Sequence, residues 1–434
     1  MKKNSILIIG TTGREHALGW KLKQSPKVGK LYFAPGNAGT ESIGESTGIN
    51  AQDVSSLVQF ALTRKIDFTV AGPDDSLAAG VVNEFKKKRL KIFGPTRQAA
   101  QIESSKAFAK QLMQVEKIPT AEFKKFTNPH QAKTYIAKQT FPLVIKASGL
   151  TLGKGVIITK TLDEAKKAID DIMIKKVFGK SGKEIIIEEF LKGQEVSIHV
   201  FSDGKTISIF PTARDHKPIF DGNQGPNTGG MGTIAPVPEI SQKTLENIKK
   251  TIVLPVIYAM KKRGIPFVGC LYPGLMITED GPKVLEFNSR FGDPEMESYM
   301  RLLQTDIFDI LVACTQGKLS KVKIKWTKKY ACCIVLASAG YPGPYEKGET
   351  IYGLDKADKN GIVVFHFGTK KHGNKILTNG GRVLGVTAVG KTLHEALKNA
   401  YTNIGPQNIH FNGMQYRRDI GKSALRGSSD GNKN

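Results

Sequence analysis

Short apolar runs alternate with helical patterns through the first hundred residues, and this alternation constrains the fold more than any other feature. The runs are SILIIG (5–10), KLYFAPGNAG (30–39), DFTVAGP (67–73) and KIFGP (91–95), and each contains or ends at a glycine. Strands separated by helices pair in parallel, with ligand loops at their carboxyl ends. The pattern predicts an α/β protein that begins with a parallel-sheet domain over 1–103.

The rest of the chain predicts a larger central domain over 104–325 and a small mixed α/β domain over 326–425. Residues 141–160 are expected to form two strands around a glycine-rich loop that acts as a lid. Hairpins are expected to turn at Asp203-Gly204 and at Glu279-Asp280-Gly281. The polar end, 426–434, is expected to be disordered.

The net charge of +25 leaves two interpretations open. It is compatible with nucleic-acid binding, but the lysines are scattered and lack interleaved aromatic residues. We favour a solvated basic surface, whose field would attract small anionic substrates. Apolar runs are shorter than the roughly 18 residues of a membrane helix. The start MKKNSILIIG leads straight into a glycine loop, so we expect a cytoplasmic protein without membrane or nucleic-acid partners.

The four cysteines lack zinc-ligand spacing and are expected to be reduced, buried thiols.

A carboxylate and an amide stand two residues apart in EFNSRFGDPEME (286–297). On a strand, Glu286 and Asn288 point to the same face, and their oxygen atoms suit Mg²⁺. Arg290 can join that face, where its guanidinium would hold a carboxylate or a phosphoryl group in transfer. The pair is a weak signal by itself and gains weight from nucleotide-binding features upstream.

Three upstream segments have such features. In KASGLTLGKGV, Lys146 ends a strand and a flexible loop with Gly153 and Gly155 follows, although this is not a Walker A motif. Lys106 lies at a helix start, within reach of a nucleotide. In EEFLKGQEVS (188–197), backbone groups of Glu189 and Leu191 are placed to read an adenine edge, and Glu195 to accept from ribose hydroxyls.

The loop GTTGREH follows the first strand. Gly10 and Gly13 permit a tight turn, and the helix beyond attracts phosphate. A dinucleotide-binding loop is the competing interpretation, but its three-glycine fingerprint is incomplete.

Taken in order, these segments resemble the glycinamide ribonucleotide synthetases of the ATP-grasp superfamily. The resemblance covers about residues 5 to 423, and it is carried by GTTGREHAL (10–18), APGNAGT (34–40), KIFGPTRQAAQIESSKAFAK (91–110), VIKASGL (144–150), GKGV (153–156), IEEFLKGQEVS (187–197), RDHKP (214–218), GPNTGGMG (225–232) and EFNSRFGDPE (286–295). GPNTGGMG and RFGDPE are the most specific of them.

The resemblance implies an ATP-grasp fold in the central domain, with a small lid subdomain at about 120–190. It implies the reaction ATP + glycine + 5-phosphoribosylamine → ADP + phosphate + glycinamide ribonucleotide, in purine biosynthesis, through a glycyl phosphate intermediate. It also implies a monomer or weak homodimer that uses ATP with Mg²⁺ or Mn²⁺.

The implied roles fall into four sets. The implied metal ligands are Glu286 and Asn288. Nucleotide contacts are expected from Lys106, Lys146, Gly153, Gly155, Glu188, Glu189, Leu191 and Glu195. Substrate contacts are expected from Gly10, Gly13, Arg14, Glu15, Gly36, Asn37, Asp215, Asn227, Arg290, Gly292 and Asp293. The catalytic set is Arg290, Asp293 and Asp215.

The chain also departs from the pattern of these enzymes. Thr12 and Ser148 stand where a glycine and an acid are usual, and GPDDSL, RDHKP and TIAP differ from the usual stretches. The departures fall near the expected substrate loops. Two alternatives therefore stay open: a diverged ligase with another acid or amine, and a basic nucleic-acid-binding protein built on a retired enzyme.

Overall fold

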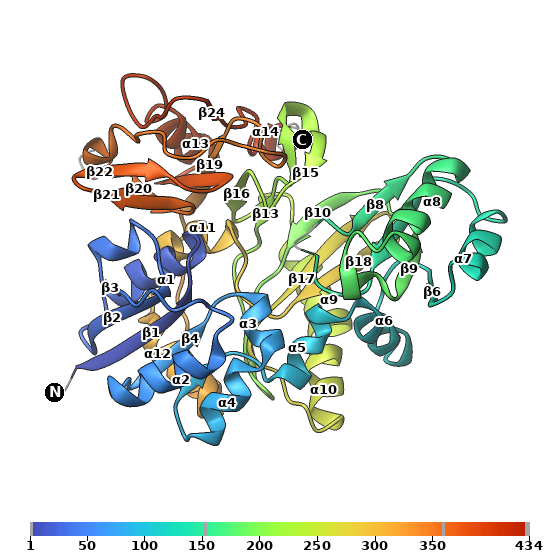
Figure 1. The fold of residues 1–434 in the computed structure, drawn as a ribbon, viewed down its shortest axis with the longest axis horizontal. Coiled ribbons are helices and arrows are strands. Elements are labelled where there is room, and N and C mark those ends of the chain that lie inside the picture. Colours follow the sequence, from blue (N-terminus) through green and yellow to red (C-terminus); the bar gives the residue numbers. More distant parts are fainter. Residues whose placement is uncertain (1–2, 152–153, 358–360, 430–434) are drawn as a thin grey trace.

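The computed structural model describes residues 3–151, 154–357 and 361–429. Its elements form several lobes (Figure 1). The N-terminal lobe has a parallel sheet in the order β3-β2-β1-β4-β5, as the alternating pattern predicted. Its strands are β1 (Asn4–Gly10), β2 (Val28–Pro35), β3 (Glu45–Ser46), β4 (Phe68–Ala71) and β5 (Ile92–Phe93). Its helices are α1 (Gly13–Leu22), α2 (Val54–Thr63), α3 (Asp74–Ala79), α4 (Val81–Lys87) and α5 (Arg97–Ser104).

The central lobe has an antiparallel sheet backed by helices. The sheet runs β10-β17-β11-β12, with β18 on β17. The predicted hairpins are both present: β11 (Val200–Asp203) with β12 (Ile207–Ile209), and β17 (Val268–Thr278) with β18 (Gly281–Asn288). The remaining elements are β10 (Gln194–Ser197), α6 (Lys106–Val115), α9 (Gln242–Ile248) and α10 (Leu254–Lys262). Buried side chains of α6, α10 and the sheet share one core.

A smaller antiparallel sheet lies to one side, at the right of Figure 1, and we call it the lid sheet. Its order is β6-β9-β7-β8, with α7 (Pro129–Ile136) and α8 (Leu162–Ile169) packed against it. Its strands are β6 (Phe123–Phe126), β7 (Leu143–Ala147), β8 (Val156–Thr159) and β9 (Ile185–Glu189). The glycine-rich loop joins β7 to β8, so two strands flank it as predicted.

The sheet of the C-terminal lobe includes two strands from the middle of the chain. Its sheet runs β13-β16-β19-β23-β20, with β24 on β19, and α13 packs against it. Here β13 (Arg214–Asp215) and β16 (Gly232–Ala235) join β19 (Tyr330–Ser338), about a hundred residues later. The other elements are β20 (Val363–His366), β21 (Thr369–His372), β22 (Lys375–Thr378), β23 (Arg382–Gly390), β24 (Met414–Gln415), α13 (Leu393–Tyr401) and the hairpin β14 (Pro218–Phe220) with β15 (Gln224–Asn227).

Helices α11 (Glu295–Leu302) and α12 (Ile307–Thr315) join the core of the N-terminal sheet. Helix α14 spans Lys422–Ser429, and the disorder of 426–434 stays a prediction. The four cysteines are free and buried, as predicted. Within the described residues, every helix is too short or too polar to cross a membrane.

A histidine pair joins the N-terminal and C-terminal lobes and predicts a loss of stability in acid. The backbone N–H of His366 donates to Nδ1 of His16 at 2.9 Å, so that nitrogen must be unprotonated. Burial lowers the pKa of His366 to about 4, and burial and His366 lower the pKa of His16 well below its usual range. The unfolded chain therefore binds more protons than the folded one between pH 6.5 and about 4. The contribution of this pair to the free energy of unfolding should fall as pH drops through this window.

Urea unfolding at pH 7 and pH 5 measures this effect. We expect His16→Gln to weaken the pH dependence, because one of the two histidines no longer titrates. An identical pH dependence in the variant and the wild type would contradict the assignment.

Candidate active site

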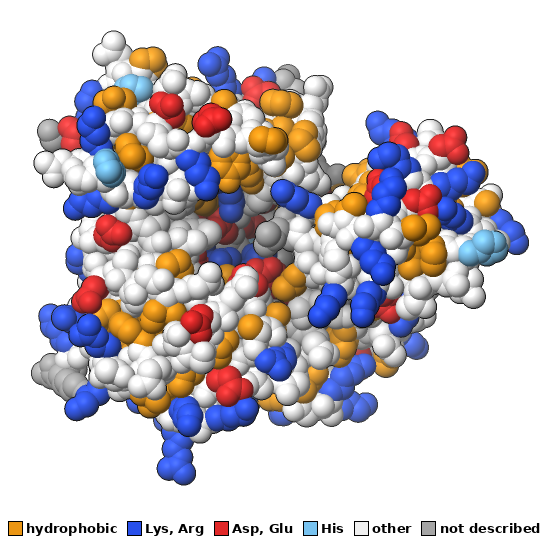
Figure 2. Space-filling model, viewed as in Figure 1, with side chains coloured by type: hydrophobic (Ala, Val, Ile, Leu, Met, Phe, Trp, Pro, Cys, Tyr) orange, Lys and Arg blue, Asp and Glu red, His pale blue; other side chains and the backbone are white. Residues whose placement is uncertain are grey.

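Charged side chains converge at the bottom of the hollow between the lobes, which Figure 2 shows as a recess containing basic and acidic groups. Strand β18 ends there. Phe287 is buried in the central core, so its neighbours Glu286 and Asn288 face the other side of the sheet. The amide nitrogen of Asn288 donates to the carbonyl of Tyr272 at 3.3 Å, which orients Oδ1 away from that strand.

Cations surround Glu286. Burial acts to raise its pKa, but the nearby positive charges outweigh burial and lower it below its ordinary value. These charges belong to Lys217, Lys106, Lys146 and Arg290. Glu286 is therefore an ionised oxygen donor beside an amide oxygen. This donor set fits a hard divalent cation such as Mg²⁺.

Arg290 is held by an acid that the sequence did not single out. Its Nη2 lies 3.1 Å from Glu103 Oε1 and donates to Asn288 Oδ1 at 3.1 Å. The other oxygen of Glu103 accepts from the backbone N–H and hydroxyl of Ser289, each at 2.8 Å. Nε of Arg290 is buried and has no hydrogen-bond partner within the described residues. The guanidinium is therefore positioned beside the candidate metal ligands.

Lys146 belongs to a buried ion-pair triad. Its Nζ lies 2.9 Å from Glu188 Oε2 and donates to the carbonyl of Leu285 at 3.0 Å. Lys110 lies 3.2 Å from the other carboxylate oxygen of Glu188. All three side chains are 7% exposed or less. Burial lowers the pKa of Lys110 to about 8 despite Glu188. The triad joins α6 to strands β7 and β9 of the lid sheet.

The lid loop also contacts the start of α6. Lys106 is the first residue of that helix, and its Nζ donates to the carbonyl of Gly149 at 3.4 Å. The Ser148 hydroxyl accepts from the backbone N–H of Ala107 at 3.2 Å. The Ser148 carbonyl accepts from the backbone N–H of Lys106 at 2.8 Å. Ser148, a departure from the family pattern, thus satisfies the first two backbone N–H groups of this helix, whose N-cap is Ser105. Gly155 lies at the end of the loop, and Gly153 lies outside the described residues.

The other residues expected to contact the nucleotide lie at the end of β9, in the segment after it and on β10. Glu189 accepts from the backbone N–H of Glu122 at 3.0 Å, and Leu191 is buried. The side chain of Glu188 pairs with Lys110 and Lys146 in the triad. Glu195 lies on β10 with about half of its side chain exposed, 3.5 Å from Lys217 Nζ.

A second cluster of acids lies next to this site. Asp293 pairs with Arg382 at 2.8 Å, and the same guanidinium donates to the carbonyls of Gly229 and Asp293 at 2.7 and 3.0 Å. Burial raises the pKa of Asp215 well above its usual range, and the charge of Glu295 adds to the shift. These acids face GPNTGGMG, since a Cβ on Gly230 would overlap Oδ1 of Asp215.

The N-terminal loop is shaped by Glu15. Its Oε2 accepts from the backbone N–H and hydroxyl of Thr12, each at 2.8 Å, and so caps α1. Gly10 has φ +132° and a Cβ there would overlap the Glu15 carboxyl, so this position requires glycine. Glu15 is fully buried, which gives it a structural task. Arg14 donates to the carbonyl of Phe291 at 3.2 Å.

The remaining predicted substrate residues differ in their contacts and in their exposure. The amide nitrogen of Asn37 donates to the carbonyls of Thr11 and His366 at 2.8 and 2.7 Å, which fixes the loop after Gly36. Gly292 donates to Nε2 of His199 at 3.1 Å. Gly13 lies against Glu297, because a Cβ there would overlap its carboxylate. Asn227 lies exposed on β15.

Several residues of the site were missed by sequence reasoning. They are Glu103, Lys110, Lys217, Glu295, Glu297 and Arg382. Glu295, Glu297 and Lys217 lie in the quoted stretches RFGDPEME and RDHKP, so their clustering with Asp293 and Asp215 was the available signal. Arg382 follows an ordinary glycine turn, and no sequence signal pointed to it.

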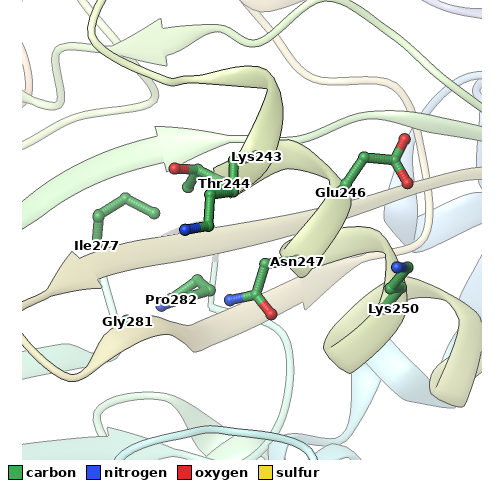
Figure 3. Close-up of a pocket in the computed structure, with 8 residues that line it drawn as sticks. All are labelled: Lys243, Thr244, Glu246, Asn247, Lys250, Ile277, Gly281 and Pro282. Atoms are coloured by element: carbon green, nitrogen blue, oxygen red, sulfur yellow. The ribbon is translucent and has the colours of Figure 1, made fainter.

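A pocket away from this site lies between α9 and the β17–β18 hairpin (Figure 3). It is lined by Lys243, Thr244, Glu246, Asn247, Lys250, Ile277, Gly281 and Pro282. The residues predicted for metal, nucleotide and substrate do not line it.

Comparison with known proteins identifies matches along nearly the whole chain. The phosphoribosylglycinamide synthetase N domain matches residues 4–103, its ATP-grasp (A) domain 104–296 and its C domain 331–423. A phosphoribosylamine–glycine ligase of Caldanaerobacter subterraneus is 48% identical over 96% of this chain and 99% of its own length.

Two further relatives extend this picture. A trifunctional purine biosynthetic protein, adenosine-3, of Gallus gallus is 47% identical over 97% of this chain, which spans 42% of that protein. The crystal structure of a phosphoribosylamine–glycine ligase from Thermotoga maritima superposes with a TM-score of 0.84 at 33% identity, covering 96% of this chain and 100% of that one.

Proposed function

Because this chain belongs to the phosphoribosylglycinamide synthetase family, we propose residue roles for the reaction of that family at the charged site. The chain is an ATP-dependent ligase of purine biosynthesis that joins glycine to 5-phosphoribosylamine and forms glycinamide ribonucleotide. Its fold is α/β, with an N-terminal parallel-sheet domain, a central ATP-grasp domain and a C-terminal mixed domain.

The observation that carries the residue roles is the group of cations whose charges act on Glu286. Lys106 lies on α6, Lys146 on β7 and Arg290 just after β18, and all three act on the end of β18. A nucleotide triphosphate brings several negative charges to one place, and such a group of cations neutralises them. The adenine would lie on backbone groups of Glu189 and Leu191, with Glu195 accepting from the ribose hydroxyls.

The chemistry requires activation of a carboxylate. Glycine is a poor acyl donor, because its leaving group would be oxide. Transfer of the γ-phosphoryl group to a glycine oxygen releases ADP and gives glycyl phosphate, whose leaving group is phosphate. The amine nitrogen of phosphoribosylamine then attacks the glycyl carbonyl, and phosphate departs as the C–N bond forms. Arg290 would neutralise charge on the phosphoryl group in transfer, and closure of the lid loop would exclude water.

Glu286 and Asn288 would hold Mg²⁺ or Mn²⁺, which when bound supplies charge neutralisation at the phosphates. The hydrogen bond from Arg290 to Asn288 fixes the amide side chain in its orientation. Gly10, Gly13, Arg14 and the loop at Gly36 and Asn37 would shape the phosphoribosylamine site.

Asp215 and Asp293, with Asn227 and Gly292 nearby in sequence, would meet the amine or the ribose hydroxyls. A cytoplasmic location, a monomer or weak homodimer, and the absence of nucleic-acid partners belong to the same proposal.

Release of ADP, measured with each substrate omitted in turn, tests this function. We expect turnover to require glycine and phosphoribosylamine together, and Glu286→Gln to abolish it while the fold is retained. Full turnover with another acid or amine would favour a diverged ligase. Salt-sensitive RNA binding without ATP turnover would favour the retired-enzyme alternative.

A further inference from the structure

Lys217 lies where the candidate nucleotide site and the second acidic cluster meet. It occupies the link between β13 and β14, and its backbone is fixed on both sides. Its carbonyl accepts from the backbone N–H and the hydroxyl of Thr228, at 2.9 and 2.7 Å. The neighbouring His216 bonds to Gly232 and accepts from Gly421 at 3.1 Å. The base of the lysine is therefore held firmly by the C-terminal sheet.

The ammonium group of Lys217 bridges two acids that have separate predicted tasks. It lies 3.5 Å from Glu195 Oε2, the expected ribose ligand, and 3.9 Å from Glu286 Oε1, the expected metal ligand. Asp215 and Glu295 add negative charge nearby. Both distances exceed the 2.7–2.9 Å of a tight charge-assisted hydrogen bond. The cation is thus shared between the acids and bound tightly to neither.

A divalent cation on Glu286 would lie close to this ammonium group. Like charges about 4 Å apart repel strongly where water is partly excluded, and a divalent ion doubles the effect. Nucleotide phosphates supply negative charge that offsets the repulsion and offers the ammonium new partners. The balance of charge therefore differs between the metal alone and the metal with a nucleotide.

We propose that Lys217 is a positioning residue that acts as an internal counter-ion of Glu286, and so disfavours metal binding until nucleotide phosphates arrive with the metal. The inference rests on the proposed metal role of Glu286. It makes the metal–nucleotide complex, and not the free metal ion, the species that the site accepts.

Titration of nucleotide-free protein with Mn²⁺ alone, followed by the electron paramagnetic resonance signal of free Mn²⁺, tests the proposal. We expect Lys217→Met to bind Mn²⁺ about tenfold more tightly than the wild type, because the repelling charge is gone. Lys217→Arg keeps the charge and should bind like the wild type. With ADP present, the difference between Lys217→Met and the wild type should shrink.

Lys283→Met is the matched control. Lys283 lies on β18, the strand of Glu286, but pairs with Glu189 and Asp280 at 3.8 and 3.5 Å. The Lys283→Met substitution should leave Mn²⁺ binding unchanged. The gain in Lys217→Met should also vanish in the double variant with Glu286→Gln, which ties it to that carboxylate.

Unchanged or weaker Mn²⁺ binding in folded Lys217→Met would overturn the inference, as would an equal gain in Lys283→Met. Lys217→Gln is a second neutral variant in case the methionine variant does not fold. A wild type that turns over with glycine and phosphoribosylamine would keep the proposed function even when this inference fails. A wild type without that turnover would remove the function itself.

Discussion

Arg290→Ala should lower kcat by about 10²- to 10³-fold, the cost of removing one preorganised charge from a phosphoryl-transfer site. The affinity for ADP should change by less than about threefold, because Lys106 and Lys146 remain. We expect kcat to fall more than ADP affinity because charge on the moving phosphoryl group develops mainly in the transition state. Steady-state ADP release and calorimetric ADP binding measure the two quantities.

The variant also leaves Glu103 buried without its cation, 3.1 Å from where the guanidinium was. Its stability must therefore be measured beside its turnover. Arg263→Ala is a matched control, because Arg263 pairs with Glu116 at 3.3 Å well away from the cations around Glu286. It should keep full kcat. Equal losses in kcat and in ADP affinity for Arg290→Ala would refute the assigned role.

Glu188→Gln should lower the free energy of unfolding by about 3–5 kcal/mol, the usual cost of breaking a buried ion pair. The substitution leaves Lys110 and Lys146 facing each other without their shared carboxylate, at 7% exposure or less. Urea unfolding measures the loss. The double variant Lys110→Met with Glu188→Gln should recover part of it, because one of the two unpaired charges is removed.

The lid sheet also supplies a control for this prediction. Glu184 pairs with Lys125 at 3.3 Å, where the lysine side chain is about half exposed. Glu184→Gln should cost less than about 1 kcal/mol, as is usual for exposed pairs. A loss of similar size in Glu184→Gln and Glu188→Gln would show that burial does not determine the effect.

Local patterns predicted the parts of the fold that local physics determines. The alternation of apolar runs and helices predicted the parallel sheet of β1, β2, β4 and β5, and turn residues predicted the β11–β12 and β17–β18 hairpins. The two-residue period of a strand placed Glu286 and Asn288 on one face. The metal, nucleotide and substrate roles of these residues stay predictions.

The partners of those residues could not be predicted in the same way. Glu103 and Arg290 are 187 positions apart, and Lys110 and Glu188 are 78 apart. An ion pair between residues far apart in sequence produces no periodic pattern in the sequence. Each of its members resembles an ordinary charged surface residue.

Residue order alone established which side chains share a face of a strand, because side-chain direction there depends only on position along the strand. Which charged groups contact one another followed from the packing of the lobes. Strand β16 pairs with β13 on one side and with β19 of the C-terminal sheet on the other. In this arrangement Lys217, which follows β13, lies near Glu286, and Asp293 lies against Arg382. Such meetings depend on the packing of whole sheets, whose free energy is summed over many distant contacts and is therefore not present in any single stretch of the chain.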